Sequence, residues 1–394
     1  MTTRVPVASA DALPFQNGPP YRFQSWLGLI RAGDPRVSRR AMLAVAIGWL
    51  PLALLTLLHG DFMRPDHENA FLLDFGAHAR FLIAAPLLIL AESLCAPRLA
   101  AIARQFSSSG LVADADRPAY ELAVQSTRRL LESRVAEWLV FFAAYALIAA
   151  MLPGKAAAGV PLWHGSINLT AFAPTPAGWW GLLVSLPLLL LLLLGWLWRV
   201  GMWTRFLWLM SRMKLRLISS HPDRAGGLMF VGYSLEAFAP LAFTLGVLGA
   251  GEVLNQVVHR GAPPEQFKYL ATGVALFAVI LFAAPVLVFV RPLIQEHRRG
   301  ILAYGAFAVR VGEQFERKWL NGQAVDAETL HDRDFAPTNS LYSITGRAFQ
   351  MRRLPFEARS VLLLAGATLL PFVPAALFAL PLDAVVRKLG GFFI

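Results

Sequence analysis

The chain has 394 residues, of which 56% are hydrophobic and only 15% are charged, whereas a soluble domain usually carries about 25% charged residues. The apolar residues fall in blocks of about 18 to 25, the length that crosses ~30 Å of hydrocarbon as a helix, so an ordinary soluble protein is excluded. The single cysteine excludes an internal disulfide and a cysteine-rich metal site. We attribute the net charge of +11 to basic loops at one membrane face and expect no nucleic-acid partner.

Seven apolar segments are predicted to cross the membrane as helices. In chain order they are residues 41–59, 77–96, 137–152, 178–200, 230–257, 269–290 and 361–380. We expect no cleavable signal peptide before them, because residues 1–40 are polar and lack a short apolar core. The seventh segment holds Pro371 and Pro374, so it is either one kinked span or a re-entrant pair of half-helices.

Lysine and arginine alternate from one loop to the next. Of the 36 such residues, 29 lie in segments 1–40, 98–135, 199–224 and 291–359, and the other 7 lie in segments 60–80, 153–178, 255–268 and 382–394. Because cytoplasmic loops are enriched in these residues, the pattern predicts a cytoplasmic N-terminus and an outside C-terminus.

The predicted fold is an all-α polytopic membrane bundle with a small cytoplasmic helical layer. Helical patterns continue past the membrane at 98–136 and 200–228, and the latter continues span four as helix to about residue 218. We divide the chain into a cytoplasmic segment 1–40, a six-span bundle 41–290, a cytoplasmic helical region 291–358, and a last span with an amphipathic tail, 359–394. Within the third region, residues 341–354 are predicted to form a basic helix at the lipid headgroups, through Arg347, Arg352 and Arg353.

The stretch SSHPDRAGGL, residues 219–228, lies between the fourth and fifth spans. Its His-Pro-Asp tripeptide also occurs in J-domains, but there is no room here for that soluble domain. We interpret the stretch as the entrance to the fifth span. Ser219 or Ser220 would cap a helix, Pro222 would fit its first turn, and Asp223 would favour the positive end of its dipole.

A functional interpretation of the same stretch remains open. Exposed amides near a helix start bind anions, so His221, Asp223, Arg224, Gly226 and Gly227 are candidates for holding a lipid phosphate or another anion. A metal pair of His221 and Asp223 is a weaker hypothesis, because two ligands do not make a site.

Ionisable groups inside a bilayer are costly and are therefore functional candidates. Glu92 is the deepest, and its structural alternative is a salt bridge to a basic residue at the rim such as Arg98. Glu236, Glu252 and Asn255 lie nearer the ends of the fifth span. Gly246, Gly249 and Ala250 give that span a small face, for which packing within the chain and a dimer contact are both open.

The outer loop at 61–80 is rich in carboxylates and imidazoles, which together bind divalent metals. His67 and His78 are weak candidates, since the spacing matches no ligand motif and a solvated loop explains it as well. We therefore predict no metal and no cofactor.

Four phrases resemble a family of bacterial multi-pass inner-membrane proteins to which no activity is assigned. They are FLLDFGAHARFLIAAPLLILAE (71–92), SSHPDRAGGL (219–228), DFAPTNSLYSITGRAFQMRRLPF (334–356) and PLDAVVRKLGGFF (381–393). The resemblance implies the bacterial inner membrane and supplies no catalytic residues.

Two functions from different classes remain. Seven proline-containing spans with a buried acid fit a transporter or channel-like protein for a small or lipid-like cargo. The alternative is a non-enzymatic scaffold or sensor that binds a partner or anionic lipid through its cytoplasmic helices. An enzyme is not expected, because no catalytic motif is present. The predicted partners are the lipid bilayer and anionic headgroups, and a homo-oligomer is left open.

Overall fold

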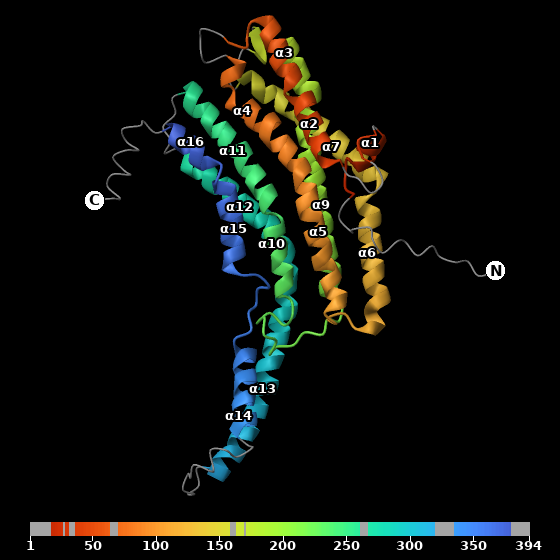
Figure 1. Ribbon diagram of the computed structural model, residues 1–394, viewed down its shortest axis with the longest axis vertical. Coiled ribbons are helices and arrows are strands. Elements are labelled where there is room, and N and C mark those ends of the chain that lie inside the picture. Colours follow the sequence, from red (N-terminus) through yellow and green to blue (C-terminus); the bar gives the residue numbers. More distant parts are fainter. Residues whose placement is uncertain are drawn as a thin grey trace, which may run out of the picture.

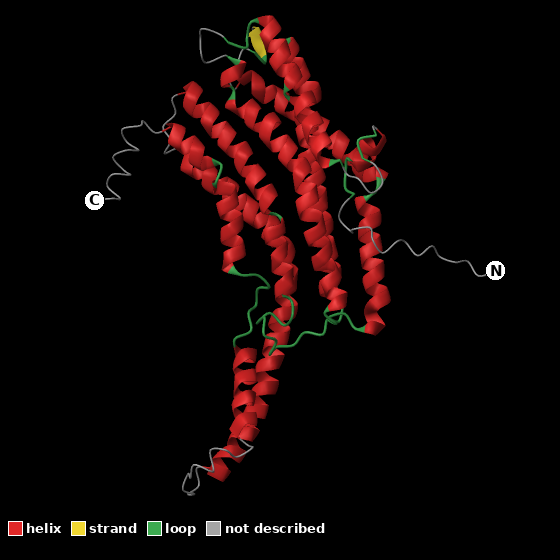
Figure 2. Cartoon of the chain, viewed as in Figure 1, coloured by secondary structure: helices red, strands yellow, loops and turns green. Residues whose placement is uncertain are grey.

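The computed structural model is helical nearly throughout (Figures 1 and 2). It describes residues 17–26, 28–30, 36–63, 70–157, 163–168, 171–260, 267–319 and 335–379. Within those ranges the only strands form one antiparallel ribbon, β1 (Gly165–Asn168) with β2 (Ala171–Pro174). The all-α prediction is therefore confirmed.

Six helical stretches of the described chain are long and apolar enough to cross a bilayer. They are Val37–His59 (α2 Val37–Gly48, α3 Leu50–His59), Phe75–Ser108 (α4 Phe75–His78, η3 Ala79–Ala84, α5 Ala85–Ser108), Arg134–Met151 (in α7 Arg134–Ala157), Pro176–Arg212 (α8 Pro176–Trp180, η5 Gly181–Ser185, α9 Leu186–Arg212), Met229–His259 (η6 Met229–Gly232, α10 Tyr233–Ala237, α11 Ala239–Arg260) and Phe267–Arg317 (α12 Phe267–Ala283, η8 Ala284–Phe289, α13 Val290–Trp319). Each coincides with one of the first six predicted spans, so the chain is an integral membrane protein.

The seventh predicted span is a broken helix. Its halves, α15 (Ala358–Leu369) and α16 (Phe372–Ala379), pass the test for a span together but are bent by 41°. Pro371 lies at the break, and a proline has no N–H with which to continue the helical hydrogen bonds. The predicted tail beyond residue 379 lies outside the described residues.

The fifth span packs closely on both sides because its small residues let backbones approach. A Cβ added to Gly246 of α11 would lie 2.0 Å from the carbonyl oxygen of Thr368 in α15, and one added to Gly251 would lie 2.3 Å from Cβ of Ala79. The small face of this span is therefore used within the chain.

The basic segments after spans two, four and six gather toward one end of the bundle, as their alternation predicts (Figure 1). There α6 (Arg117–Leu131), which follows the short turn η4 (Asp114–Asp116), lies beside α9. The guanidinium of Arg205 in α9 donates to the hydroxyls of Ser126 and Thr127 in α6, at 3.2 and 2.9 Å. These contacts form the helical layer that the sequence predicts at this end.

The prediction that span four continues as helix to about residue 218 is wrong. The helix ends at Arg212, and residues 213–218 are extended. In MKLRL, residues 213–217, half-buried apolar residues alternate with exposed basic ones, which is the period-two pattern of extended chain. The backbone amide of Arg216 accordingly donates to the carbonyl of Leu111, at 2.8 Å.

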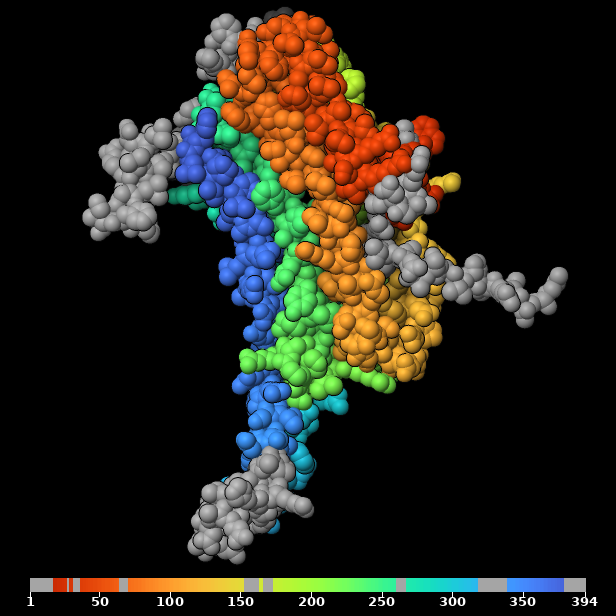
Figure 3. Space-filling view, in the orientation of Figure 1, coloured from red at the N-terminus to blue at the C-terminus, as the bar shows by residue number. Residues whose placement is uncertain are grey.

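Beyond the bundle, α13 pairs with α14 (Phe335–Phe349) in a narrow projection (Figures 1 and 3). We call α14 and the part of α13 from Gly300 onward the stalk, and the end that carries it the stalk end. The prediction was instead a helix over 341–354 lying at the headgroups. α14 ends five residues earlier and covers α13, where His297 Nε2 lies 3.3 Å from the carbonyl oxygen of Phe349.

A short N-terminal helix, α1 (Tyr21–Trp26), lies against the junction of α6 and α7. The backbone amides of Arg22 and Phe23 both donate to the carboxylate of Glu137. The carbonyl oxygen of Pro19 lies so close to Gly195 of α9 that a Cβ there would be 2.2 Å away. The described N-terminal residues are thus packed into the bundle.

Candidate functional site

Glu92 is the centre of a buried ion cluster. Its two carboxylate oxygens each lie 2.7 Å from a guanidinium nitrogen, one of Arg40 and one of Arg199. The arginines are only 4% and 5% exposed. Arg199 also donates to the carbonyl of Gly18, at 3.2 Å. The expectation of a salt bridge is confirmed, but its partners come from spans one and four and not from Arg98, which is exposed.

The cluster carries one more positive than negative charge, and it is tied to a tryptophan. The guanidinium of Arg199 lies over the ring of Trp196, 4.9 Å from the centroid. The Trp196 indole N–H donates to the carbonyl of Leu88, one turn before Glu92. The sequence prediction missed both arginines. Arg40 and Arg199 lie at the same ends of spans one and four as Glu92 does of span two, but ordinary rim residues lie there too.

The other polar candidates of the spans are peripheral and lie apart from this cluster. Glu236 accepts a hydrogen bond from the Ser360 hydroxyl at 3.2 Å, and the exposed Glu252 accepts one from Gln256, four residues on. The side-chain oxygen of Asn255 is buried without a hydrogen-bond partner in the described chain.

The stretch at 219–228 is a folded loop and not a helix entrance. Helical structure begins only at Met229, and Asp223 sits inside the loop. The carboxylate of Asp223 accepts from the backbone amides of Ala225, Gly227 and Met229, at 2.8, 3.1 and 3.1 Å. Of the candidate amides, that of Gly227 donates to this carboxylate, and those of His221 and Arg224 donate to the carbonyls of Ile218 and His221. These amides are therefore occupied by the chain itself.

His221 completes the bonding of Asp223. Its Nδ1 lies 2.7 Å from Asp223 Oδ1 and 3.3 Å from the backbone N of the same residue. We assign a proton to Nδ1, donated to the carboxylate, because the shorter contact to a charged acceptor is the stronger one. No described residue bonds Nε2, so that edge of the ring remains available.

The loop holds Asp223 ionised. Burial, the largest single effect, would raise the pKa of its carboxyl, but the bonds from Ala225, Met229, Gly227 and His221 together lower that pKa below its ordinary value. A carboxylate that accepts several backbone N–H bonds is stabilised in its charged form.

Three residues of the loop have left-handed backbone. Arg224, Gly226 and Gly227 have φ of 58°, 66° and 95°, the region that glycine adopts without strain. The carbonyl of Arg224 accepts from the amide of Arg352, at 2.6 Å. The loop is thereby bound to the segment that follows the stalk.

The loop also contacts α13 at the base of the stalk. A Cβ on Gly300 would lie 2.4 Å from the Ser219 side chain. The hydroxyls of Ser220 and Tyr304 are 3.0 Å apart. The loop is therefore the joint between the bundle and the stalk.

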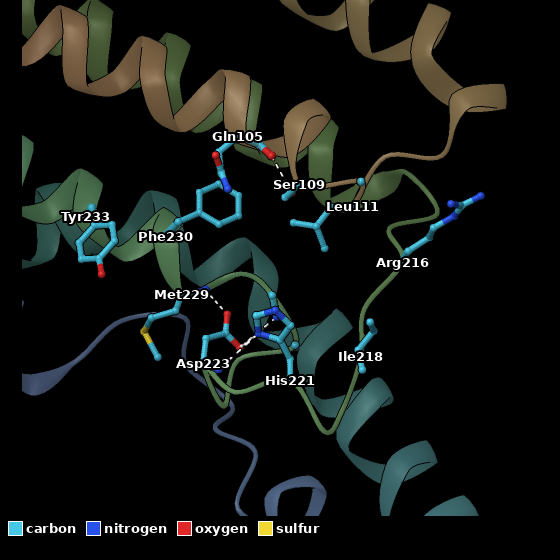
Figure 4. A pocket seen from close by; sticks show the side chains of 13 residues that line it. Gln105, Ser109, Leu111, Arg216, Ile218, His221, Asp223, Met229, Phe230 and Tyr233 are labelled. Carbon is cyan, nitrogen blue, oxygen red and sulfur yellow. Dashed lines mark hydrogen bonds and ion pairs between the residues drawn. The ribbon is translucent and has the colours of Figure 1, made fainter. Parts of the chain in front are cut away.

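A cavity of about 440 Å³ opens beside this loop (Figure 4). Its lining comes from the end of α5, from the loop with the extended segment before it, and from the start of the fifth span. His221 and Asp223 face each other on one side, and Gln105 lies on the other. The volume falls in the range of small-molecule sites.

Exposed basic residues occur at the end of α9 and in the extended segment after it, in the loop, and in the segment that follows α14. We call them the basic collar: Arg212, Lys214, Arg216, Arg224, Arg352 and Arg353. Arg352 pairs with Glu357 at 3.4 Å. Arg347, the remaining predicted headgroup residue, is exposed on α14. The structure thus brings Arg224, Arg352 and Arg353 to the loop and leaves Arg347 on the stalk.

The weak metal candidates fall elsewhere. His67 lies outside the described residues. Both nitrogens of His78 have partners: Nδ1 lies 2.9 Å from the Trp49 indole nitrogen and Nε2 lies 2.9 Å from the carbonyl oxygen of Leu72. Both ring nitrogens are therefore used in contacts between the first span and the start of the second.

Comparisons with known proteins supply no relative. No protein-family model, no curated protein and no solved structure matches the chain.

Proposed function

We propose that this integral membrane protein is a non-enzymatic scaffold or sensor that binds anionic lipid at its stalk end. The observation that carries the proposal is the basic collar around a cavity, at the joint between bundle and stalk. Each lysine or arginine near an anionic membrane surface contributes about 1 kcal/mol of attraction. The collar lies near the start of the apolar fifth span, which supports contact with the headgroups.

The bundle interior offers less support for ion-coupled transport. Glu92, the residue on which such a pathway would depend, has both oxygens occupied by arginines. A proton or ion carrier needs a group that can exchange its partner. The function is better placed at the stalk end.

The test is retention of anionic lipid by the purified full-length protein, measured by native mass spectrometry with phosphatidylglycerol against phosphatidylcholine. Lys214→Gln with Arg353→Gln removes two collar charges that line no wall of the cavity. We expect retention of phosphatidylglycerol to fall by roughly tenfold or more. The control is Lys268→Gln at the opposite end, which should leave retention unchanged. Equal retention of the two lipids by the wild-type protein would contradict the proposal.

A second candidate, transport of a lipid-like cargo, is favoured by one observation. An apolar hollow of about 50 Å³ lies between α5, α9, α11 and α12, lined by Leu88, Trp196, Leu245 and Phe282 among others. If cargo passes there, Leu245→Trp should abolish lipid transfer between the leaflets of proteoliposomes that contain the protein. Transfer at the rate of protein-free vesicles by the wild type would exclude this candidate.

We further propose a bacterial inner-membrane location with the N-terminus in the cytoplasm. The alternation of 29 against 7 basic residues supports it. Reporter fusions after residues 109 and 168 test it, because they should report opposite compartments, the first of them cytoplasmic.

A further inference from the structure

The cavity at the joint is lined by side chains with unused hydrogen-bonding groups. His221 Nε2, the Gln105 amide nitrogen and the Tyr233 hydroxyl form no hydrogen bond with the described chain. The Gln105 side-chain oxygen already accepts from Ser108, at 3.2 Å, which leaves its NH₂ group as the free end. The amide and the hydroxyl are donors, and Nε2 becomes a donor when the His221 ring carries a proton on both nitrogens, so the set is suited to an acceptor-rich ligand.

The one carboxylate that lines the cavity has no free oxygen with which to attract a cation. Asp223 is the only carboxylate among the lining residues. Its oxygens are occupied by three backbone amides and by His221. A cationic ligand would have to displace those bonds, whereas an anion would leave them intact. Arg216 at the cavity's edge turns its guanidinium outward in Figure 4 and adds positive potential at the mouth.

The rest of the lining is apolar and continues into the membrane-spanning part. Leu111, Met229 and Phe230 form this side, and Met229 begins the fifth span. A ligand that places an anion near His221 can therefore extend an apolar portion along Phe230. This combination is the chemistry of an anionic lipid, although a free phosphate shares its polar half.

We infer that the cavity binds a phosphate oxyanion, carried by a lipid headgroup or by free phosphate, with His221 and Gln105 as the donors. With a proton on both nitrogens, the His221 ring would donate from Nε2 to the oxyanion while Nδ1–H stays on Asp223. Asp223 is a positioning residue, since it fixes the ring and does not touch the ligand. The inference rests on the proposed function and narrows it from the collar to one saturable site.

The experiment is titration of the purified full-length protein with three probes, followed by native mass spectrometry and calorimetry. The probes are dioctanoyl-phosphatidylglycerol, inorganic phosphate and dioctanoylglycerol, which has the tails without the phosphate. We expect saturable binding of the phosphate-bearing probes, weakened by about tenfold or more in His221→Ala and in Gln105→Leu, because each loses a charge-assisted hydrogen bond. If phosphate displaces the lipid at similar concentration, the ligand is free phosphate, and if it does not, the ligand is the lipid.

His59→Ala is the matched control, an exposed histidine at the opposite end. Protection of the buried Cys95 from thiol reagents confirms that each variant is folded. Binding of dioctanoylglycerol as tightly as of the phospholipid would overturn the inference, and so would equal binding by His221→Ala and the wild type. Collar variants that still lose phosphatidylglycerol in that case would leave the proposed function standing without this site.

Discussion

Two carboxylates of this protein are held by opposite means. Glu92 receives its bonds from Arg40 and Arg199, which lie 52 and 107 residues away in other spans. Asp223 receives its bonds from amides and an imidazole within six residues of itself. The first arrangement exists only when three helices have assembled, whereas the second can form as soon as the loop closes.

This difference determines what each carboxylate can do. The Glu92 cluster joins spans one, two and four, and its charges are buried, so it specifies how the bundle packs. The Asp223 loop orders a short segment and leaves the far edge of His221 free to bind. Substitutions at Glu92 should therefore weaken the packing of the whole bundle, whereas substitutions at Asp223 should disorder only the loop.

The largest loss of folding stability is expected from Glu92→Gln. The change leaves two buried guanidiniums without a counter-charge, which costs about 3–5 kcal/mol in the free energy of unfolding. Unfolding titrations in mixed micelles, followed through labelling of the buried Cys95, measure it. Glu252→Gln is the control, because Glu252 is exposed and should cost under about 0.5 kcal/mol. Equal effects of the two substitutions would mean that the cluster does not hold the bundle.

A partial rescue follows from the excess positive charge of the cluster. Adding Arg40→Gln to Glu92→Gln removes one unpaired charge, so the double variant should be more stable than the sum of the single losses predicts. The expected coupling is up to about 3 kcal/mol. The same titration measures it in a double-mutant cycle. Strict additivity would show that Arg40 and Glu92 are not energetically linked.

Asp223→Asn should have a smaller and local effect. Asparagine keeps one oxygen acceptor but loses the charge, at a cost of about 1–2 kcal/mol. Hydrogen exchange should rise in residues 218–230 and stay unchanged around Glu92. Loss of protection across the whole bundle would contradict the local character of this loop.

Asp223 should also make the stability of the loop depend on pH. Because folding lowers the pKa of Asp223, its stabilising contribution is present above the ordinary value of ~3.9 and is lost as pH falls through the lowered value. Exchange in the wild-type loop should therefore approach that of Asp223→Asn below about pH 4. A difference between the two proteins that persists unchanged to pH 2 would contradict this assignment.

Features that depend on composition and period could be predicted from the sequence. The spans, their alternation and the break at Pro371 follow from apolar length, basic residues and proline chemistry. The partners of Glu92 could not be predicted, since Arg40 and Arg199 read equally well as ordinary rim residues until the helices are placed side by side. The extended stretch before the loop carried a usable signal, the alternation in MKLRL, which the apolar helix preceding it obscured.

The smallest effect concerns the contact between loop and stalk. Ser220→Ala and Tyr304→Phe each remove one hydroxyl of a half-buried pair 3.0 Å apart, at a cost of about 0.5–1 kcal/mol. Since the pair is one bond, the double variant should cost no more than either single variant, and exchange in α13 near Tyr304 reports it. Tyr342→Phe on the stalk is a control that leaves this bond intact. If the two single effects add, the hydroxyls act independently, and the loop would be joined to the stalk through the Arg224–Arg352 backbone bond and the packing of Ser219 on Gly300 alone.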